Sequence, residues 1–367
     1  MRQFSLRKLS DLGINRRNFD ENIGVEVDKL LDRLDSMQKK PLSIAHTFTT
    51  SIVNIIWGVV AGEKFSFEDP SIKVIHNDLL GTMQALFPLT MLTMLPKIFR
   101  KICTSLQLFG YGHIIRSQEW FSSYMKKHRE YQKTDMFPRN LLDDFIDEQI
   151  IENKEDMDNE IPFLLRDLFA ASSDTTTSIM GFMIHALITR KDMQDKIRQE
   201  IVTQVGSSER IIYEHASRMP FTLAFLSEMQ RTANITPVGA MHRLTGPLAV
   251  RGYTLPENTL VTANFHAIHN DPKYFDNPEE FNPGRFLDEK GNYKDNKDSF
   301  FPFSVGKRRC MGEEFAKAKL FLFITHLIQK FEVTPVVGQK LPPLQRTLSL
   351  IVQPKSFDFS VQKIEYT

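Results

Sequence analysis

The sequence predicts a mainly α-helical fold with a minor β region, and two observations support this prediction. Apolar residues recur at helical spacing through most of the chain before Pro237. From there to Phe300, short β-like runs alternate with turns rich in Pro and Asn. A chain of 367 residues could form one large domain or two, and it can bury a substantial core.

The expected helices follow one another along the chain. Residues 1–39 are polar and amphipathic, and they are followed by helices expected at 43–61, 71–90, 116–133 and, as the longest, about 162–189. Residues 140–160 are acidic, and we expect them to end in an exposed loop. Residues 86–99 form an apolar stretch between two prolines. For this stretch a core-facing turn and a patch that touches a membrane surface both remain open.

Composition excludes several classes of protein. The formal net charge is +1 and the pI is near 7.8, so nothing indicates a nucleic-acid partner. Only two cysteines are present, Cys103 and Cys310, which excludes a disulfide framework and favours a reducing compartment. No segment reaches the roughly 18 uninterrupted apolar residues of a membrane-spanning helix, and the first residues are not a signal peptide.

The stretch FFPFSVGKRRCMGEEFAKAKL, residues 300–320, places Cys310 just before an expected helix and just after three basic residues. A helix N-terminus offers N–H donors and positive potential, which keep a thiolate anionic. A zinc site lacks further Cys or His ligands nearby, and a catalytic nucleophile would want a base. The residue chemistry leaves a buried structural thiol and a thiolate ligand to haem iron as alternatives.

The stretch FSVGKRRCMG resembles the haem-ligand loop of the haem-thiolate monooxygenases, the cytochromes P-450. The family pattern is F-x-x-G-x-R-x-C-x-G, and its fixed positions fall on Phe303, Gly306, Arg308, Cys310 and Gly312. The resemblance implies that residues 1–367 form a single domain with the triangular cytochrome P-450 fold. It also implies the cofactor haem b, iron protoporphyrin IX. It makes Cys310 the axial ligand of the iron and Arg308 a contact of a haem propionate.

Two further motifs of the family stand upstream of the cysteine. Glu228 and Arg231 have the E-x-x-R spacing, which puts both side chains on one face of a helix. In the family an arginine of an F-x-P-x-R-F loop joins this pair, and FNPGRF supplies Arg285. We expect these three residues to be structural. His242 is expected to contact a haem propionate, with a solvated loop histidine as the alternative.

The expected long helix carries FAASSDTTTSIM, which resembles the A-G-x-D/E-T-T/S motif of the family. The resemblance makes Asp174 and Thr175 the pair that delivers protons during dioxygen activation. Ser172 replaces the glycine of the motif. We expect its hydroxyl either to bond to the carbonyl of Leu168 and bend the helix or to crowd the groove.

The resemblance covers essentially the whole chain and is closest to the animal microsomal enzymes that metabolise drugs and fatty acids. It places MRQF within a helix that binds haem, with Arg2 as a further propionate contact. We therefore expect the chain to lack an N-terminal membrane anchor, the first helices and the first strands of the family. By the same resemblance, the protein belongs on the cytoplasmic face of the endoplasmic reticulum membrane.

The activity implied is insertion of one oxygen atom from dioxygen into a lipophilic substrate such as a xenobiotic, a fatty acid or a steroid-like compound. Electrons would come from an NADPH-dependent flavoprotein reductase that docks near Lys307 and Arg309, with a cytochrome b-type protein as a further donor. Two alternatives remain. One is a catalytically silent haem-binding or unstable fragment of such an enzyme, and the other is a helical scaffold without a cofactor.

Overall fold

The computed structural model describes residues 17–92, 96–132, 140–152, 157–296, 298–347 and 349–366. The chain divides into two compact units. Unit 1 comprises Met1–Met219 and Met311–Thr367, and unit 2 comprises Pro220–Cys310. Helices dominate and the strands are short, so the prediction of a mainly α fold with a minor β region is confirmed. No helix among the described residues is long and apolar enough to span a membrane.

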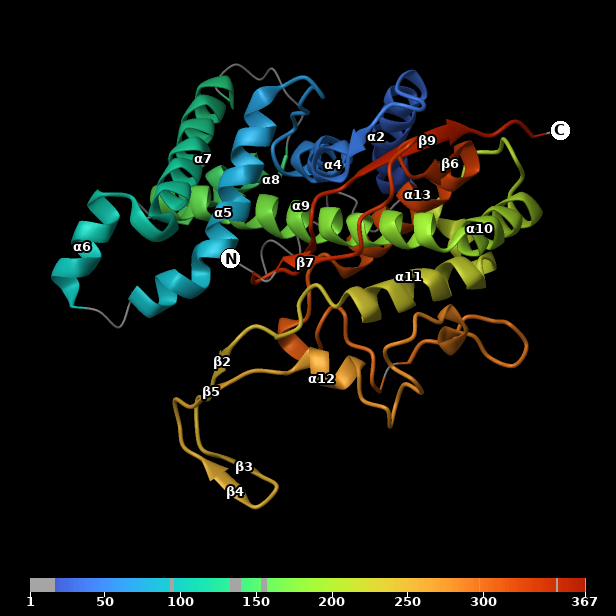
Figure 1. Ribbon diagram of the computed structural model, residues 1–367. Coiled ribbons are helices and arrows are strands. Elements are labelled where there is room, and N and C mark those ends of the chain that lie inside the picture. The colour runs from blue at the N-terminus through green and yellow to red at the C-terminus, as the bar shows by residue number, and fades with distance from the viewer. Residues whose placement is uncertain are drawn as a thin grey trace. The chain divides into compact units, whose positions relative to one another are not determined.

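Unit 1 is built around one long helix, α9 (Met157–Thr189). Helices α4, α5, α7 and α13 pack against it, and α4, α5 and α7 can be followed along it in Figure 1. The other helical segments of this unit are α2 (Arg17–Ser36), α3 (Ile44–Thr47), α4 (Thr49–Val60), α5 (Pro70–Leu92), α6 (Lys97–Ser105), η2 (Leu108–Gly110), α7 (Tyr111–Gln132), α8 (Leu141–Glu152), α10 (Lys191–Gln204), η3 (Tyr213–Arg218) and α13 (Glu313–Lys330).

An aromatic cluster fixes the first half of α9. Trp57 of α4 is fully buried, and its ring meets the ring of Phe169 on α9 edge-on at 5.5 Å. Phe121 of α7 packs on the same ring at 5.7 Å. Such edge-to-face pairs add about 0.5–1.5 kcal/mol each beyond the area they bury. The cluster therefore anchors α9 immediately before the segment Ser172–Thr176.

The sheets of unit 1 join segments that are far apart in the sequence. A three-stranded antiparallel sheet has the order β1-β9-β6, with Leu42 opposite Phe359 and Val333 opposite Val361. Phe359 and Val361 are fully buried on one face of their strand, and Ser360 between them is 2% exposed on the other, so both faces of the strand are covered here. The strands are β1 (Leu42–Ser43), β6 (Phe331–Thr334) and β9 (Asp358–Lys363), and a separate pair is formed by β7 (Arg346–Thr347) and β8 (Gln353–Pro354).

The apolar stretch 86–99 does not form a core-facing turn at its described end. Residues 93–95 lie outside the described residues, and α6 begins at Lys97. Ile98 is 67% exposed and Phe99 is 55% exposed. This part of the core-facing prediction is wrong, because α6 lies at the edge of unit 1 (Figure 1), where Ile98 and Phe99 remain exposed.

Unit 2 contains the β-like runs that the sequence predicts. Strand β3 pairs with β4 through a two-residue turn at Arg251 and Gly252, both of which have positive φ. Such turns match the twist of a hairpin, and glycine adopts them without strain. The elements are α11 (Pro220–Ala233), β2 (His242–Arg243), β3 (Leu248–Val250), β4 (Tyr253–Leu255), β5 (Leu260–Val261), α12 (Phe265–His269), η4 (Pro283–Phe286) and η5 (Gly306–Arg308), with β2 antiparallel to β5.

A small apolar core holds unit 2 together. It consists of Ala224 from α11 with Phe275, Phe286 and Phe300, and the rings of Phe286 and Phe300 lie 4.9 Å apart. Since Phe300 begins the segment that leads to Cys310, this core ties that segment to α11 and η4.

Candidate active site

Cys310 ends a tight loop of unit 2. Its backbone N–H donates to the carbonyl of Phe303 at 2.9 Å, which closes the loop around the short helical turn η5. Ser304 and Gly306 both have positive φ, at 63° and 77°. Cys310 forms no disulfide and is exposed, whereas Cys103 is buried. Of the two alternatives for Cys310, the buried structural thiol is therefore wrong, since the loop presents the thiol on the surface of the unit.

The loop has the features that a haem-thiolate group requires. A thiolate is the axial ligand of iron in this class of haem protein. A Cβ atom built on Gly306 would meet no atom within 4 Å, and the same holds at Gly312. The backbone at both glycines thus leaves open space against which a flat group can lie. Arg308 is exposed on η5 and can pair with a carboxylate such as a propionate. These residues fit a haem.

Unit 2 also brings together Glu228, Arg231 and Arg285. The Nε and Nη2 atoms of Arg231 donate to the two carboxylate oxygens of Glu228 at 2.7 and 2.8 Å. Nε of Arg285 lies 3.4 Å from the same carboxylate, which also accepts from the backbone N–H of Asn282 at 2.8 Å. Glu228 and Arg231 are fully buried. Burying this pair is tolerable because its hydrogen-bonding capacity is used.

The arginines of this network also bind backbone carbonyls of the loops around them. Arg231 donates from Nη1 to the carbonyl of His269 at 2.8 Å and from Nη2 to that of Glu280 at 3.2 Å. Arg285 donates to the carbonyls of Asp276, Asn277 and Glu280. The network therefore fixes the backbone between α12 and η4.

His269 extends this network to the cysteine segment, and sequence reasoning missed it. Its Nε2 accepts the backbone N–H of Phe301 at 3.0 Å. Burial, and to a smaller extent the charge of Arg231, lowers the pKa of His269 from 6.5 to about 4, so the ring is neutral and can accept this bond. The available signal was the histidine-rich run HAIHNDP just before the FNPGRF loop.

Of the two further residues predicted to contact a propionate, the structure describes only His242. His242 lies in β2, opposite Val261, and is exposed. Arg2 lies outside the described residues.

The predicted proton-delivery residues lie side by side on α9 but face different partners. Asp174 is 1% exposed, and its Oδ1 lies 3.2 Å from Nε2 of His76 on α5. The hydroxyl of Thr175 donates to the carbonyl of Ala171 at 2.8 Å, and Thr175 is only partly buried. Successive residues of a helix point about 100° apart, which explains the separate environments. No motif in the sequence marks His76 as a partner of Asp174.

Ser172 does not make the bond that we expected for it. Its hydroxyl donates to the carbonyl of Phe169 at 3.0 Å, one residue nearer than Leu168, and Ser173 donates to the same carbonyl at 2.8 Å. The prediction of a bond to Leu168 is therefore wrong. A serine hydroxyl reaches the carbonyls three or four residues back, and the side-chain rotamer decides which.

The carbonyl of Ser172 accepts two further side-chain donors. These are the Thr176 hydroxyl at 3.0 Å and Nζ of Lys319 at 3.1 Å. Lys319 comes from α13 and is 1% exposed, with its Nζ 4.5 Å from the centre of the Phe315 ring. Side-chain donors that bond to helix carbonyls favour a bend. In α9 these bonds gather at Ser172, the position where the family motif has glycine.

A thiol presented on a closed loop before a helix, with open backbone at both neighbouring glycines, fits a haem-thiolate protein. Among the described residues no group of three or more His, Cys, Asp or Glu side chains could hold a metal ion by itself. The chain belongs to the cytochrome P450 family, whose model matches residues 1–361. It is therefore an oxidoreductase, a monooxygenase of the P450 type with a haem-thiolate cofactor.

Curated relatives agree with this assignment. Cytochrome P450 2A5 of Mus musculus is 31% identical over 339 residues, which cover 90% of this chain and 68% of the relative. Cytochrome P450 2J5 of Mus musculus is 32% identical over 377 residues, covering 97% and 71%. Cytochrome P450 2A13 of Homo sapiens is 29% identical over 375 residues, covering 100% and 73%.

Proposed function

We propose that the protein inserts one oxygen atom from dioxygen into a lipophilic small molecule such as a xenobiotic, a fatty acid or a steroid-like compound. The observation that carries this proposal is the exposed Cys310 at the end of its closed loop. We assign Cys310 as the axial ligand of haem b. When bound, this group supplies the activation of dioxygen, and the residues of the chain hold it, orient the substrate and move protons.

Five further residues have roles in holding the haem. Arg308, His242 and Arg2 pair with its propionates, since guanidinium and imidazolium groups bind carboxylates strongly. Gly306 lets the backbone approach the flat face of the group, and Phe303 closes the loop through its carbonyl. Glu228, Arg231 and Arg285 are structural and keep the backbone of unit 2 in place. We propose that residues 1–367 act as one functional domain.

Asp174 and Thr175 are proposed to deliver protons. The Thr175 hydroxyl now donates to the carbonyl of Ala171, and its oxygen can still accept a hydrogen bond. Its own proton becomes available for transfer only after the hydroxyl releases that carbonyl. Asp174 is the acid that resupplies the hydroxyl.

An electron donor fits the basic end of unit 2. Lys307, Arg308 and Arg309 are consecutive and exposed, next to the proposed iron ligand. Positive surface charge steers an acidic partner to the correct face. We propose an NADPH-dependent flavoprotein reductase as this partner, with a cytochrome b-type protein as a further donor.

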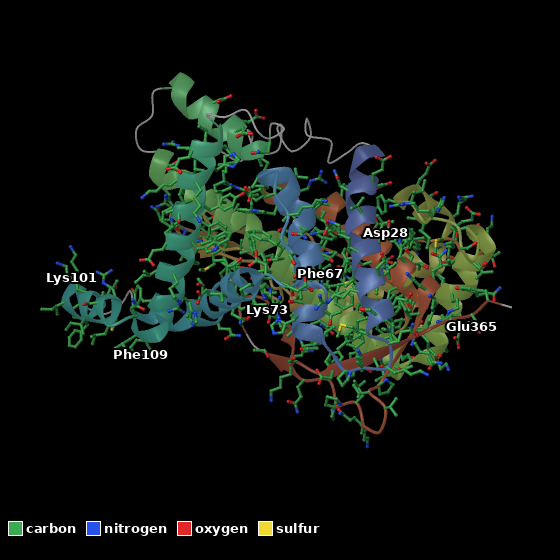
Figure 2. All side chains as sticks on the ribbon, turned by 90° about the horizontal axis from the view of Figure 1, so that it is seen from above. Asp28, Phe67, Lys73, Lys101, Phe109 and Glu365 are labelled. Carbon is green, nitrogen blue, oxygen red and sulfur yellow. The ribbon has the colours of Figure 1, made fainter. Side chains whose placement is uncertain are left out.

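Helix α6 is proposed to touch a membrane surface. Its apolar Ile98, Phe99 and Ile102 are exposed, and Lys97, Arg100 and Lys101 accompany them. Figure 2 shows Lys101 and, just beyond the helix, Phe109 at the outer edge of this part of unit 1. Basic amphipathic helices bind the interface of anionic bilayers. This supports a location on the cytoplasmic face of the endoplasmic reticulum membrane.

The test of the proposal is the spectrum of the carbon monoxide complex after Cys310→Ser. A thiolate ligand shifts the Soret band of this complex strongly to the red, because it donates electron density to the iron. We expect Cys310→Ser to abolish the red-shifted band. Cys103→Ser is the matched control and should leave the band in place. Loss of the band in the control alone would refute the assignment.

A second measurement separates an active enzyme from a silent haem protein. With a reductase present, the wild-type chain should couple NADPH consumption to product, whereas a silent protein would keep the red-shifted band without turnover. Thr175→Ala should divert the consumed NADPH to peroxide. Unchanged coupling would remove Thr175 from the mechanism.

A further inference from the structure

Unit 1 contains a buried contact between a histidine and the acid of the long helix. Nε2 of His76 lies 3.2 Å from Oδ1 of Asp174, and the two residues are 3% and 1% exposed. The Ser173 hydroxyl, which has a single proton to share with the nearer carbonyl of Phe169, also lies 3.2 Å from Oδ1. Among the described residues, neither Nε2 of His76 nor Oδ2 of Asp174 has a hydrogen-bond partner of good geometry. Buried polar atoms of this kind are rare in proteins and call for an explanation.

His76 also lines a cavity of about 120 Å³ that α2, the segment Pro41–Thr50 and α5 enclose. Its exposed lining residues include Pro41, His46 and Lys73, and its buried ones include Thr50 and His76. Figure 2 marks Lys73 on α5 together with Phe67, another lining residue. The cavity therefore runs from solvent to the imidazole that touches Asp174.

The charges around His76 differ in sign on its two sides. On the cavity side stand Arg33 of α2, His46 of α3 and Lys73 of α5. Burial, and then the charges of Lys73 and His76, lowers the pKa of His46. On the α9 side stands the Asp174 carboxylate. Asp78, the other acid nearby on α5, is bonded to His113 and Arg116. A proton at His76 is thus repelled from the cavity side and attracted toward Asp174.

We propose that His76 is the proton donor that reprotonates Asp174, and that the cavity is the entrance for those protons. This inference rests on the proposed proton role of Asp174. In the step, the Nε2–H bond of the His76 imidazolium breaks and an O–H bond forms on the Asp174 carboxylate. Neutral His76 then takes a proton from solvent through the cavity. The monooxygenase reaction consumes protons, so Asp174 loses its proton in each turnover and the cycle repeats.

The chain offers a matched control. His128 of α7 and Asp143 of α8 form a second buried histidine–aspartate contact, with Nε2 and Oδ1 2.8 Å apart. This pair is not joined to Asp174 by any contact among the described residues, and it does not line the cavity. His128→Asn should therefore reproduce the loss of a buried pair without touching the proposed route.

The first experiment compares the histidine side-chain resonances of the purified full-length protein and its variants by NMR at one fixed pH. The resonances that disappear in His76→Asn identify His76. They should shift in Asp174→Asn, because Nε2 of His76 lies 3.2 Å from the carboxylate that this change removes. They should not shift in His128→Asn. Resonances of His76 that are the same with and without the Asp174 carboxylate would overturn the proposal.

The second experiment measures turnover with NADPH and a reductase, in H₂O and D₂O, beside turnover driven by hydrogen peroxide. Hydrogen peroxide already carries the two protons, so the peroxide-driven reaction does not require Asp174 to be reprotonated. His76→Asn should lower the NADPH-driven rate at least about tenfold and raise the solvent isotope effect. A side chain that transfers a proton directly to the reacting group contributes roughly 100- to 10,000-fold, and a residue that acts through Asp174 contributes less. The peroxide-driven rate should be unchanged, and His128→Asn should behave as wild type in both reactions.

A third variant tests the entrance with His76 intact. Thr47 lines the cavity and is only partly buried, so Thr47→Phe should fill the entrance without a large cost to folding. We expect the same pattern as for His76→Asn. If Asp174→Asn is slow while His76→Asn and Thr47→Phe are both normal, the relay is wrong and the role of Asp174 stands. If Asp174→Asn is itself normal, the proposed role of Asp174 fails, and the relay with it.

Discussion

Arg231→Met should be among the most destabilising single substitutions in unit 2. The change removes two hydrogen bonds to the buried Glu228 carboxylate and the donors to the carbonyls of His269 and Glu280. Glu228 keeps the Asn282 N–H at 2.8 Å and the more distant Nε of Arg285 at 3.4 Å. Breaking a buried ion pair on one side costs about 3–5 kcal/mol, a large part of the roughly 5–15 kcal/mol of a typical domain.

The assay is urea unfolding followed by circular dichroism at pH 7, with the free energy of unfolding extrapolated to water. Lys196→Met is the control, because it removes an exposed i,i+4 pair with Asp192 at 3.6 Å and should cost about 0.5 kcal/mol or less. Glu228→Leu combined with Arg231→Met should cost less than the sum of the two single changes, since no charge is then left alone. The reasoning is refuted if Arg231→Met costs no more than Lys196→Met, or if the double variant costs as much as the sum of the two single changes.

Three more outcomes are expected. The pKa of His269 is about 4 in the folded protein and 6.5 in the unfolded chain, so the unfolded chain takes up a proton first as the pH falls. This should lower the free energy of unfolding by about 3 kcal/mol between pH 6.5 and pH 4. Urea midpoints across this range should depend less on pH in His269→Gln. The free energy of unfolding should be about 1 kcal/mol lower in Ser172→Gly than in Ser172→Ala, because glycine is the poorer helix former. Equal values in the two variants would contradict this. Ile98→Asp with Phe99→Asp should weaken sedimentation with anionic vesicles at least about tenfold, while Val337→Asp, at another exposed apolar residue, should not.

The part of the candidate site that could be predicted is the part that local sequence determines. Glu228 and Arg231 meet because three residues along a helix bring two side chains to one face. The loop before Cys310 depends on nearby residues, above all on Gly306 at its positive φ. The helix expected at about 162–189 is α9, which begins five residues earlier, at Met157, because an apolar pattern fixes the middle of a helix better than its end.

The sequence by itself thus determined the fold class, the family and the identity of the cysteine loop. Tertiary structure alone decided that His76 of α5 touches Asp174 of α9, that His269 accepts the N–H of Phe301, and that α6 exposes its apolar side chains. Each of these depends on which segments pack together, and no periodicity within one segment encodes its partner. The same holds for the hydrogen bond of Ser172. Its hydroxyl can reach the carbonyl of Leu168 or that of Phe169, and the structure shows the bond to Phe169.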